Sequence, residues 1–335
     1  MLAVSAPAAA YNIHAKGKHH ERMTWLSEKC LADSEGLPEK CEFPANADEF
    51  EDISGPTFRR GEYWKAVRWP DDPTRQLDEL WTMAKFAGTV QFVCPSLVEE
   101  QGFFAGLTCG SHYGQMQFLH AMSSAEDETT EHTRALIEGW SRFSFRVAVG
   151  AIEPSENYCE STHRNAGAAA TRLAPEGLEY CEARTVDGVN FDAWTVGTLL
   201  TFHCDKMFSS KTCDLLVDED GSLARRSAVG ALLHLIQDSY SQAHTGRGED
   251  NPTGPYTPKV ECSPVESFYL YVHNEANHSA ADRAPYFAES CSSENGTLDP
   301  ITAGARLLYY VQQGSESEEA TIDMILNDVL GGNAS

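Results

Sequence analysis

The sequence predicts a mostly α-helical protein with a single domain. Apolar residues recur at helical spacing in several long stretches, whereas the apolar–polar alternation of half-buried strands is scarce. In the stretch that begins at Ala228, apolar residues cover most of the circumference of the expected helix, and a helix that is apolar on nearly all sides is buried. With 335 residues, 41% of them hydrophobic, the chain can build a core around that helix.

This buried helix carries polar side chains that need partners. His234 and Asp238 are one turn apart on the same face, and His244 follows six residues later. A shared cation would satisfy both groups, because residues at i and i+4 present nitrogen and oxygen to one point, as zinc requires. His244 lies roughly 80° away around an ideal helix, so we expect it to bind a second ion nearby. A hydrogen bond between His234 and Asp238 without metal is the alternative.

The other elements follow from periodicity and from the distribution of glycine and proline. A first helix is expected near His20, where Met23, Leu26 and Cys30 recur at helical spacing. Residues 31–60 are acidic and aperiodic and are interpreted as a loop, and the Gly-, Pro- and Asn-rich residues 153–190 as a surface insertion. Further helices are expected at 77–86, 131–152, 191–208, 301–313 and 320–330.

The cysteines indicate an exported protein. There are ten, none in a Cys-x2-Cys pair, and they fall into neighbouring couples, which favours disulfides over zinc thiolates. The simplest pairing is Cys30/Cys41, Cys94/Cys109, Cys159/Cys181, Cys204/Cys213 and Cys262/Cys291.

The first residues and the charge agree with export. Residues 1–10 are similar to the end of a secretory signal with an Ala-x-Ala cleavage site, so we expect a signal-peptide remnant at 1–10 and one domain at 11–335. No run of about 18 apolar residues suggests a membrane span. The formal charge of −25 disfavours electrostatic binding to DNA or an anionic membrane without bound metal. We expect a secreted or periplasmic protein.

Further candidate ligands lie on either side of the buried helix. His20 stands at the start of the first helix, with His14 as the alternative, and Asp71 and Asp72 stand between two prolines in a stiff turn. An Asp-rich turn of this kind can also simply cap the following helix.

Two more stretches contain histidines. His112 follows Ser111 and precedes an aromatic residue, and His120 is a rival ligand or a hydrogen-bond donor behind the ligands. After the buried helix, His278 and Asp282 repeat the i, i+4 spacing of an imidazole and a carboxylate.

In their order along the chain these motifs resemble the zinc-dependent phospholipase C and single-strand-specific nuclease superfamily, closest to the bacterial secreted zinc phospholipases C. The resemblance rests on His-x3-Asp-x5-His at 234–244, Trp-x-Asp at 69–71, Ser-His-aromatic at 111–113 and His-x3-Asp at 278–282. It implies an all-α, single-domain fold of that type with disulfide-closed loop insertions. The sequence departs from the family at Gln237, where glycine is usual, and at Tyr11, where tryptophan is usual.

The resemblance also implies three zinc ions per chain and a ligand for each position. Asp238 would bridge a close pair of ions whose other ligands are His234, His112, Asp71, His20 and the chain terminus at Tyr11. The third ion would be bound by His244, His278 and Asp282. Asp71 would also be the catalytic residue that orients the attacking water.

The function implied is that of a secreted phospholipase C. It would hydrolyse the phosphodiester of phospholipids such as phosphatidylcholine to diacylglycerol and a phosphorylated head group, acting as a monomer at a membrane or micelle surface. The alternative is a single-strand-specific nuclease of the same fold, with nucleic acid as the substrate and an aromatic platform for stacked bases. A secreted metal-binding module without enzymatic activity is the third candidate.

Overall fold

The computed structural model describes residues 18–53, 61–71, 94–96, 98–99, 107–186, 189–204, 213–215, 221–248, 256–273, 281, 283–292 and 296–332. Helices dominate these residues, and the strands are only two to four residues long. The prediction of a mostly helical protein is confirmed. The expected helix at 77–86 lies outside the described residues.

The longer helices correspond to stretches of apolar periodicity in the sequence. They are α1 (His19–Asp33), α6 (Thr130–Ala148), α10 (Ser222–Asp238) and α12 (Pro300–Gln313). Shorter helices are α2 (Ala47–Glu51), η2 (Ala66–Arg68), α5 (Leu107–Tyr113), η5 (Gln117–His120), α7 (Tyr158–Asn165), η6 (Gly167–Ala169), α8 (Ala170–Leu173), η7 (Glu179–Cys181), α9 (Val196–Thr201), η8 (Glu289–Ser292), η9 (Ser315–Ser317), α13 (Glu318–Asp323) and the π-helical turn η10 (Met324–Val329).

The strands form four separate two-stranded pairs. Three are antiparallel: β1 (Arg184–Val186) with β2 (Val189–Phe191), β3 (Phe202–Cys204) with β4 (Cys213–Leu215), and β5 (Thr245–Arg247) with β7 (Val265–Phe268). The fourth pair is parallel and joins β6 (Lys259–Val260) to β8 (Tyr286–Phe287).

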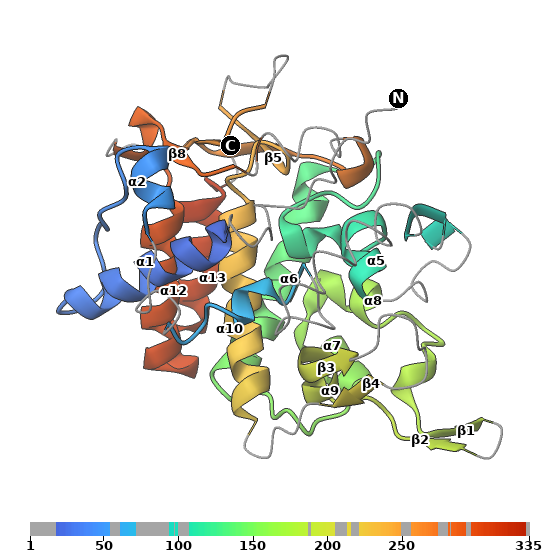
Figure 1. The fold of residues 1–335 in the computed structure, drawn as a ribbon. Coiled ribbons are helices and arrows are strands. Elements are labelled where there is room, and N and C mark those ends of the chain that lie inside the picture. The colour runs from blue at the N-terminus through green and yellow to red at the C-terminus, as the bar shows by residue number, and fades with distance from the viewer. Residues whose placement is uncertain are drawn as a thin grey trace.

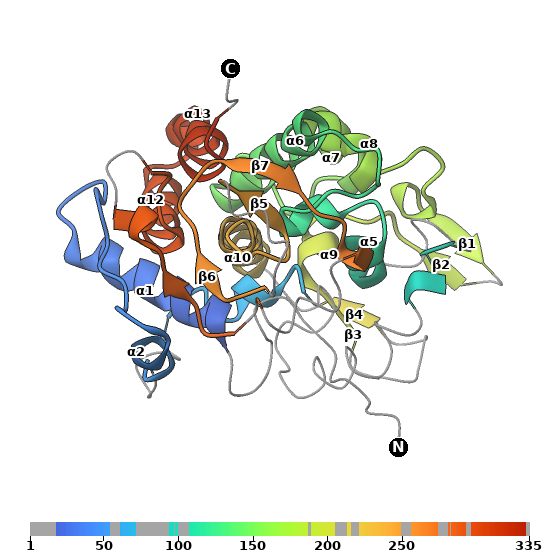
Figure 2. The ribbon, with the colours of Figure 1, turned by 90° about the horizontal axis from the view of Figure 1, so that it is seen from above.

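Helix α10 is the centre of the molecule (Figure 1). Figure 2 looks down its axis and shows α1, α12, α6 and α9 around it, and each of these helices contacts it. From Val229 to Asp238 every residue of α10 is buried, as its apolar circumference predicts. Side chains of α6, α9, α10 and α12 belong to one continuous hydrophobic core.

A glycine lets η2 approach α10 more closely than any other residue could. A Cβ atom on Gly230 would lie 2.2 Å from the carbonyl carbon and oxygen of Ala66, well inside van der Waals contact. The next residues of this segment are anchored from both sides. Trp69 stacks on Trp140 of α6 with ring centroids 5.8 Å apart, and Arg68 donates through Nε to the buried carboxylate of Glu21 at 2.6 Å.

Helix α10 is shorter than the sequence pattern suggested. It ends at Asp238, and Ser239 follows as its C-cap, so His244 does not lie on the helix but in the turn before β5. The backbone N–H groups of Ser241 and His244 donate to Asp238 and Ser241 carbonyls, respectively, in a chain of tight turns. The expected angle of His244 around the helix axis was therefore wrong.

Residues 31–60 contain more helix than expected. Helix α1 continues to Asp33, and α2 begins after Asn46, whose side chain accepts a hydrogen bond from the backbone of Glu49. The Glu49 carboxylate in turn accepts the backbone N–H of Ala45. This reciprocal pattern is close to a capping box, and it stabilises a helix too short to show periodicity.

The interpretation of 153–190 as a surface insertion was wrong. The segment forms α7, α8 and the β1–β2 hairpin, and its residues Tyr158, Ala169 and Leu173 belong to the main core. Short helices gain most of their stability from tertiary packing, which periodicity cannot reveal. The expected helix at 191–208 is also shorter, because the chain leaves α9 at Thr201 and pairs with β4 instead.

The predicted disulfide pairing is confirmed for four couples: Cys30–Cys41, Cys94–Cys109, Cys159–Cys181 and Cys262–Cys291. The remaining couple, Cys204 and Cys213, lies directly opposite in the register of β3 and β4. Within the described part of the chain, no helix combines the length and the apolar character needed to span a membrane.

Candidate metal centre

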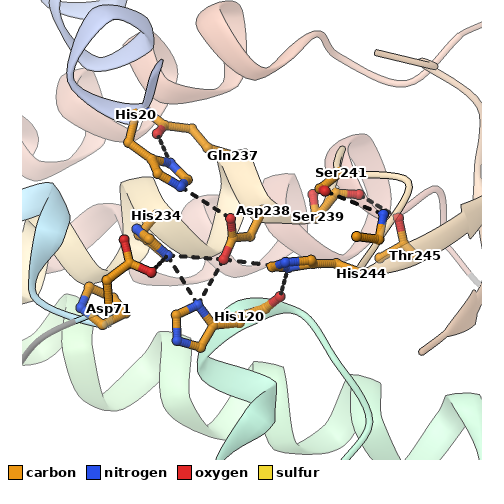
Figure 3. Close-up of polar contacts among 12 residues, drawn as sticks. His20, Asp71, His120, His234, Gln237, Asp238, Ser239, Ser241, His244 and Thr245 are labelled. Carbon is orange, nitrogen blue, oxygen red and sulfur yellow. Dashed lines mark hydrogen bonds and ion pairs between the residues drawn. The ribbon is translucent and has the colours of Figure 1, made fainter. Parts of the chain in front are cut away.

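The C-terminal end of α10 is surrounded by buried histidines and carboxylates (Figure 3). Five elements contribute: the start of α1, the segment after η2, the end of η5, α10 itself and the turn before β5. The side chains are His20, Asp71, His120, His234, Asp238 and His244, and each is at most 2% exposed.

Asp238 lies at the middle of this cluster, with imidazoles facing both of its oxygens. Its Oδ1 lies 3.3 Å from Nε2 of His20. Its Oδ2 lies 2.9 Å from Nε2 of His234 and 2.8 Å from Nδ1 of His120. The two oxygens of one carboxylate are therefore directed at different imidazole sets (Figure 3).

Two groups of described residues bring ligand atoms close enough for one ion. In each group the atoms lie within 4.8 Å of one another, and the groups are His20, His234 and Asp238, and Asp71, His120 and His234. His234 belongs to both, and its Nε2 lies 3.6 Å from Oδ1 of Asp71. Clusters of His and Asp that could bind a metal ion are therefore present.

Oxygens orient three of the imidazoles, and for His20 and His234 this oxygen lies on the side away from Asp238, whereas Nδ1 of His244 also faces Asp238, 3.4 Å from its Oδ2. Nδ1 of His234 donates to the carbonyl of Val67 at 2.8 Å, and Nδ1 of His244 donates to the carbonyl of His120 at 2.7 Å. Nδ1 of His20 lies 2.7 Å from Oε1 of Gln237. Oxygen acceptors behind the ring are usual for metal-binding histidines, since they fix the tautomer that leaves Nε2 free to bind the ion.

Burial and the central carboxylate set the protonation of the cluster. Burial lowers the pKa of His234 to about 3. Burial alone would raise the pKa of Asp238, but the surrounding histidines, His234 first, hold it well below its usual value. Burial opposes the charge on His20, yet the hydrogen bond and charge of Asp238 outweigh it and raise the pKa of His20 to about 9. An ionised Asp238 and a neutral His234 are the states that a metal ion needs.

The structure brings His120, and not His112, into the ligand groups. His112 lies on α5, where its Nδ1 is 3.0 Å from the hydroxyl oxygen of Ser111, and its ring contacts that of His120 at 4.7 Å between centroids. His120 ends η5 and is followed by Ala121 in the left-handed region at φ 52. That conformation costs about 1 kcal/mol or more in a residue with a side chain, and it turns the chain directly after His120.

The other candidates from the sequence are distributed as follows. His20, Asp71, His234 and Asp238 converge in one cluster, and His244 reaches it from beyond the helix end, with its Nδ1 3.4 Å from Oδ2 of Asp238. Tyr11, His14, Asp72, His278 and Asp282 lie outside the described residues.

Sequence reasoning missed the groups that orient the ligands. Gln237 stood out only as a departure from the resembled family, where glycine is usual, and the Val67 carbonyl has no signature in the sequence. Comparison with protein-family models, with curated proteins and with solved structures finds no match to this chain. The motifs and the assembled cluster are therefore the basis of the functional argument.

Proposed function

We propose that this protein is a secreted zinc-dependent phosphodiester hydrolase that acts on phospholipids as a phospholipase C. The observation that carries the proposal is the buried Asp238 carboxylate, which directs one oxygen to His20 and the other to His234 and His120. A carboxylate with imidazoles on both sides is suited to bridge two closely spaced cations. Paired metal ions are a recurrent solution for displacement at phosphorus.

The chemistry of the ligand atoms fits zinc. Zinc favours imidazole nitrogen with carboxylate oxygen, and the cluster offers both from buried side chains. In His20 and His234 the nitrogen that faces away from Asp238 is already hydrogen-bonded. His20 and Asp238 would bind one ion, and Asp71, His120, His234 and Asp238 the other. His244 would contribute to a third ion together with His278 and Asp282. When bound, such ions lower the pKa of a water toward about 7 and neutralise charge on the phosphoryl oxygens.

We assign to Asp71 the role of accepting the proton of the attacking water. Its carboxylate is 1% exposed and lies beside His234, where it can accept a proton from the water as the new oxygen–phosphorus bond forms. The bond from phosphorus to the glycerol oxygen breaks, and that oxygen takes the proton held by Asp71 to become the hydroxyl of diacylglycerol, which returns Asp71 to the carboxylate. Water is consumed, and the products are diacylglycerol and the phosphorylated head group.

The positive charge that neutralises the substrate phosphate must come mainly from the bound zinc ions. Arg68, the nearest arginine along the chain to Asp71, pairs with Glu21, and the chain carries a formal charge of −25. A phosphodiester approaching this cluster would meet the carboxylates of Asp71 and Asp238. Activity should therefore depend strictly on bound metal.

A side-by-side hydrolysis assay tests the proposal. Zinc-loaded protein is given phosphatidylcholine micelles and single-stranded DNA, and release of phosphocholine without nucleotide is expected. Nucleotide release alone would support the nuclease instead. If the zinc-loaded protein hydrolyses neither substrate, only the metal-binding module without enzymatic activity remains. Asp238→Asn should lose zinc and at least about 100-fold in turnover, since a bridging ligand matters more than the residues behind it. The exposed Asp192→Asn is the matched control and should retain both.

A further inference from the structure

Gln237 connects α10 to α1 beside the metal centre. It precedes Asp238 on α10, and its side chain points to α1 although the residue is fully buried at 0% exposure. Its Oε1 lies 2.7 Å from Nδ1 of His20, and its Nε2 donates to Oγ1 of Thr24 at 3.0 Å. Both ends of the amide are therefore used, and both partners belong to one helix, four residues apart.

The amide orientation decides which nitrogen of His20 carries a hydrogen. With Nε2 of Gln237 donating to Thr24, the group that faces His20 is an oxygen, and an amide oxygen can only accept. Nδ1 of His20 must then be protonated. At a pH below its pKa of about 9, the His20 ring of the zinc-free protein also carries a proton on Nε2. When a cation takes the place of that proton, the lone pair is on Nε2, which lies 3.3 Å from Oδ1 of Asp238.

Stacking restricts the remaining freedom of the His20 ring. It lies 4.1 Å from the ring of His234, with 25° between the planes. This contact fixes the plane of the imidazole, and the Gln237 bond fixes its rotation within that plane. His20 differs here from His234 and His244, whose Nδ1 atoms donate to main-chain carbonyls. Its acceptor is a side chain and can be changed by substitution.

We propose that Gln237 is a positioning residue that selects the His20 tautomer with Nε2 directed at the cation next to Asp238. The consequence for metal binding rests on the proposed zinc centre, whereas the hydrogen bond itself does not. Gln237 does not touch the substrate, and it acts only through His20.

The first test follows the Nδ1 proton of His20 by NMR in zinc-free protein labelled with ¹⁵N in histidine. The signal is assigned by its loss in His20→Asn. Wild type and Gln237→Glu should show an Nδ1–H that exchanges slowly with water, because both offer an acceptor oxygen. Gln237→Met has a similar volume and no acceptor, so the signal should be lost. Gln242→Met is the matched control, since Gln242 accepts from Thr257 and makes no bond to His20.

Thr24→Val provides a second variant that leaves Gln237 in place. It removes the hydroxyl to which Nε2 of Gln237 donates and loosens the amide, so exchange of the His20 Nδ1 proton should accelerate even if Gln237→Met fails to fold. Slow exchange that persists in Thr24→Val and Gln237→Met would overturn the proposal. Absence of the slowly exchanging signal from wild type would also overturn the proposal. In that case the amide nitrogen of Gln237, and not its oxygen, would face His20.

The second test is a zinc titration of the same variants. Gln237→Met should weaken one zinc ion by about 10–100-fold, the usual effect of losing an orienting partner, and Gln237→Glu should restore it. A protected Nδ1–H in a protein that binds no zinc would refute the proposed function and leave the role of Gln237 in orienting His20. Normal zinc binding without a protected Nδ1–H would refute the role of Gln237 and leave the metal centre.

Discussion

Replacing Gly230 by alanine tests whether the close approach of η2 to α10 builds the metal centre. In the interior of a helix alanine is normally favoured over glycine by about 1 kcal/mol. Here the new Cβ would lie 2.2 Å from the carbonyl group of Ala66, whereas carbon contacts need about 3.5 Å. The segment would have to move by roughly 1 Å, and such overpacking costs about 1–3 kcal/mol. We expect a net loss of stability of up to about 2 kcal/mol, whereas helix propensity alone would predict a gain.

The same displacement should reach the ligands. Val67 follows Ala66 and accepts the Nδ1–H of His234, and Asp71 lies four residues further on. Zinc affinity should therefore fall about tenfold or more, as it does when an orienting partner is lost.

Urea unfolding of the zinc-free protein and a zinc titration measure the two effects separately. Gly36→Ala is the control, because nothing lies within 4 Å of the position its Cβ would take; it should change stability by less than about 0.5–1 kcal/mol. If Gly230→Ala is as stable as wild type and binds zinc normally, the close approach of η2 is not required and the argument fails.

Three further predictions concern stability. Arg68→Met should cost about 3–5 kcal/mol, because it leaves the Glu21 carboxylate buried without its guanidinium; adding Glu21→Leu should recover most of the loss, and a double-mutant cycle without that recovery would contradict the pairing. Burial raises the pKa of Asp299, so the folded protein binds this proton more tightly than the unfolded chain and gains stability as the pH falls through that pKa. Relative to Asp299→Asn, wild type should therefore become more stable as the pH falls toward about 4, the ordinary pKa of an aspartate, and a difference independent of pH would refute this. Replacing Cys30 and Cys41 by serine opens a loop of 11 residues and should cost about 2–3 kcal/mol in thermal unfolding; an unchanged unfolding temperature would exclude a stabilising role.

The sequence predicted the parts of the fold that depend on local pattern. The apolar circumference of α10 predicted its burial, and the amphipathic stretch at 131–152 corresponds to α6 within a few residues. Neighbouring cysteines predicted four disulfides. Each of these features is decided by residues close together in the chain.

Features decided by distant contacts were not predicted. Helices α7 and α8 are short and depend on packing, as where the backbone of Ala166 approaches Gly139 of α6 so closely that a Cβ there would lie 2.0 Å from the carbonyl oxygen. Spacing alone cannot decide which of two histidines enters a site when a turn separates them. Helix η5 and the left-handed Ala121 after it place His120 against Asp238. The ring of His112 contacts the ring of His120 instead.

In the candidate site, too, the features decided by neighbouring residues were predicted and those decided by distant contacts were not. The i, i+4 pair His234 and Asp238 was visible because one helix places both. The roles of Gln237 and of the Val67 carbonyl became visible only with the fold, because they depend on how α1 and η2 pack against α10.

Anomalous diffraction at the zinc edge from crystals grown with zinc tests the central claim most directly. Two maxima are expected beside the Asp238 carboxylate, one next to Oδ1 and His20 and one next to Oδ2, His234 and His120. A protein that hydrolyses phosphatidylcholine but shows no zinc maximum at Asp238 would contradict it.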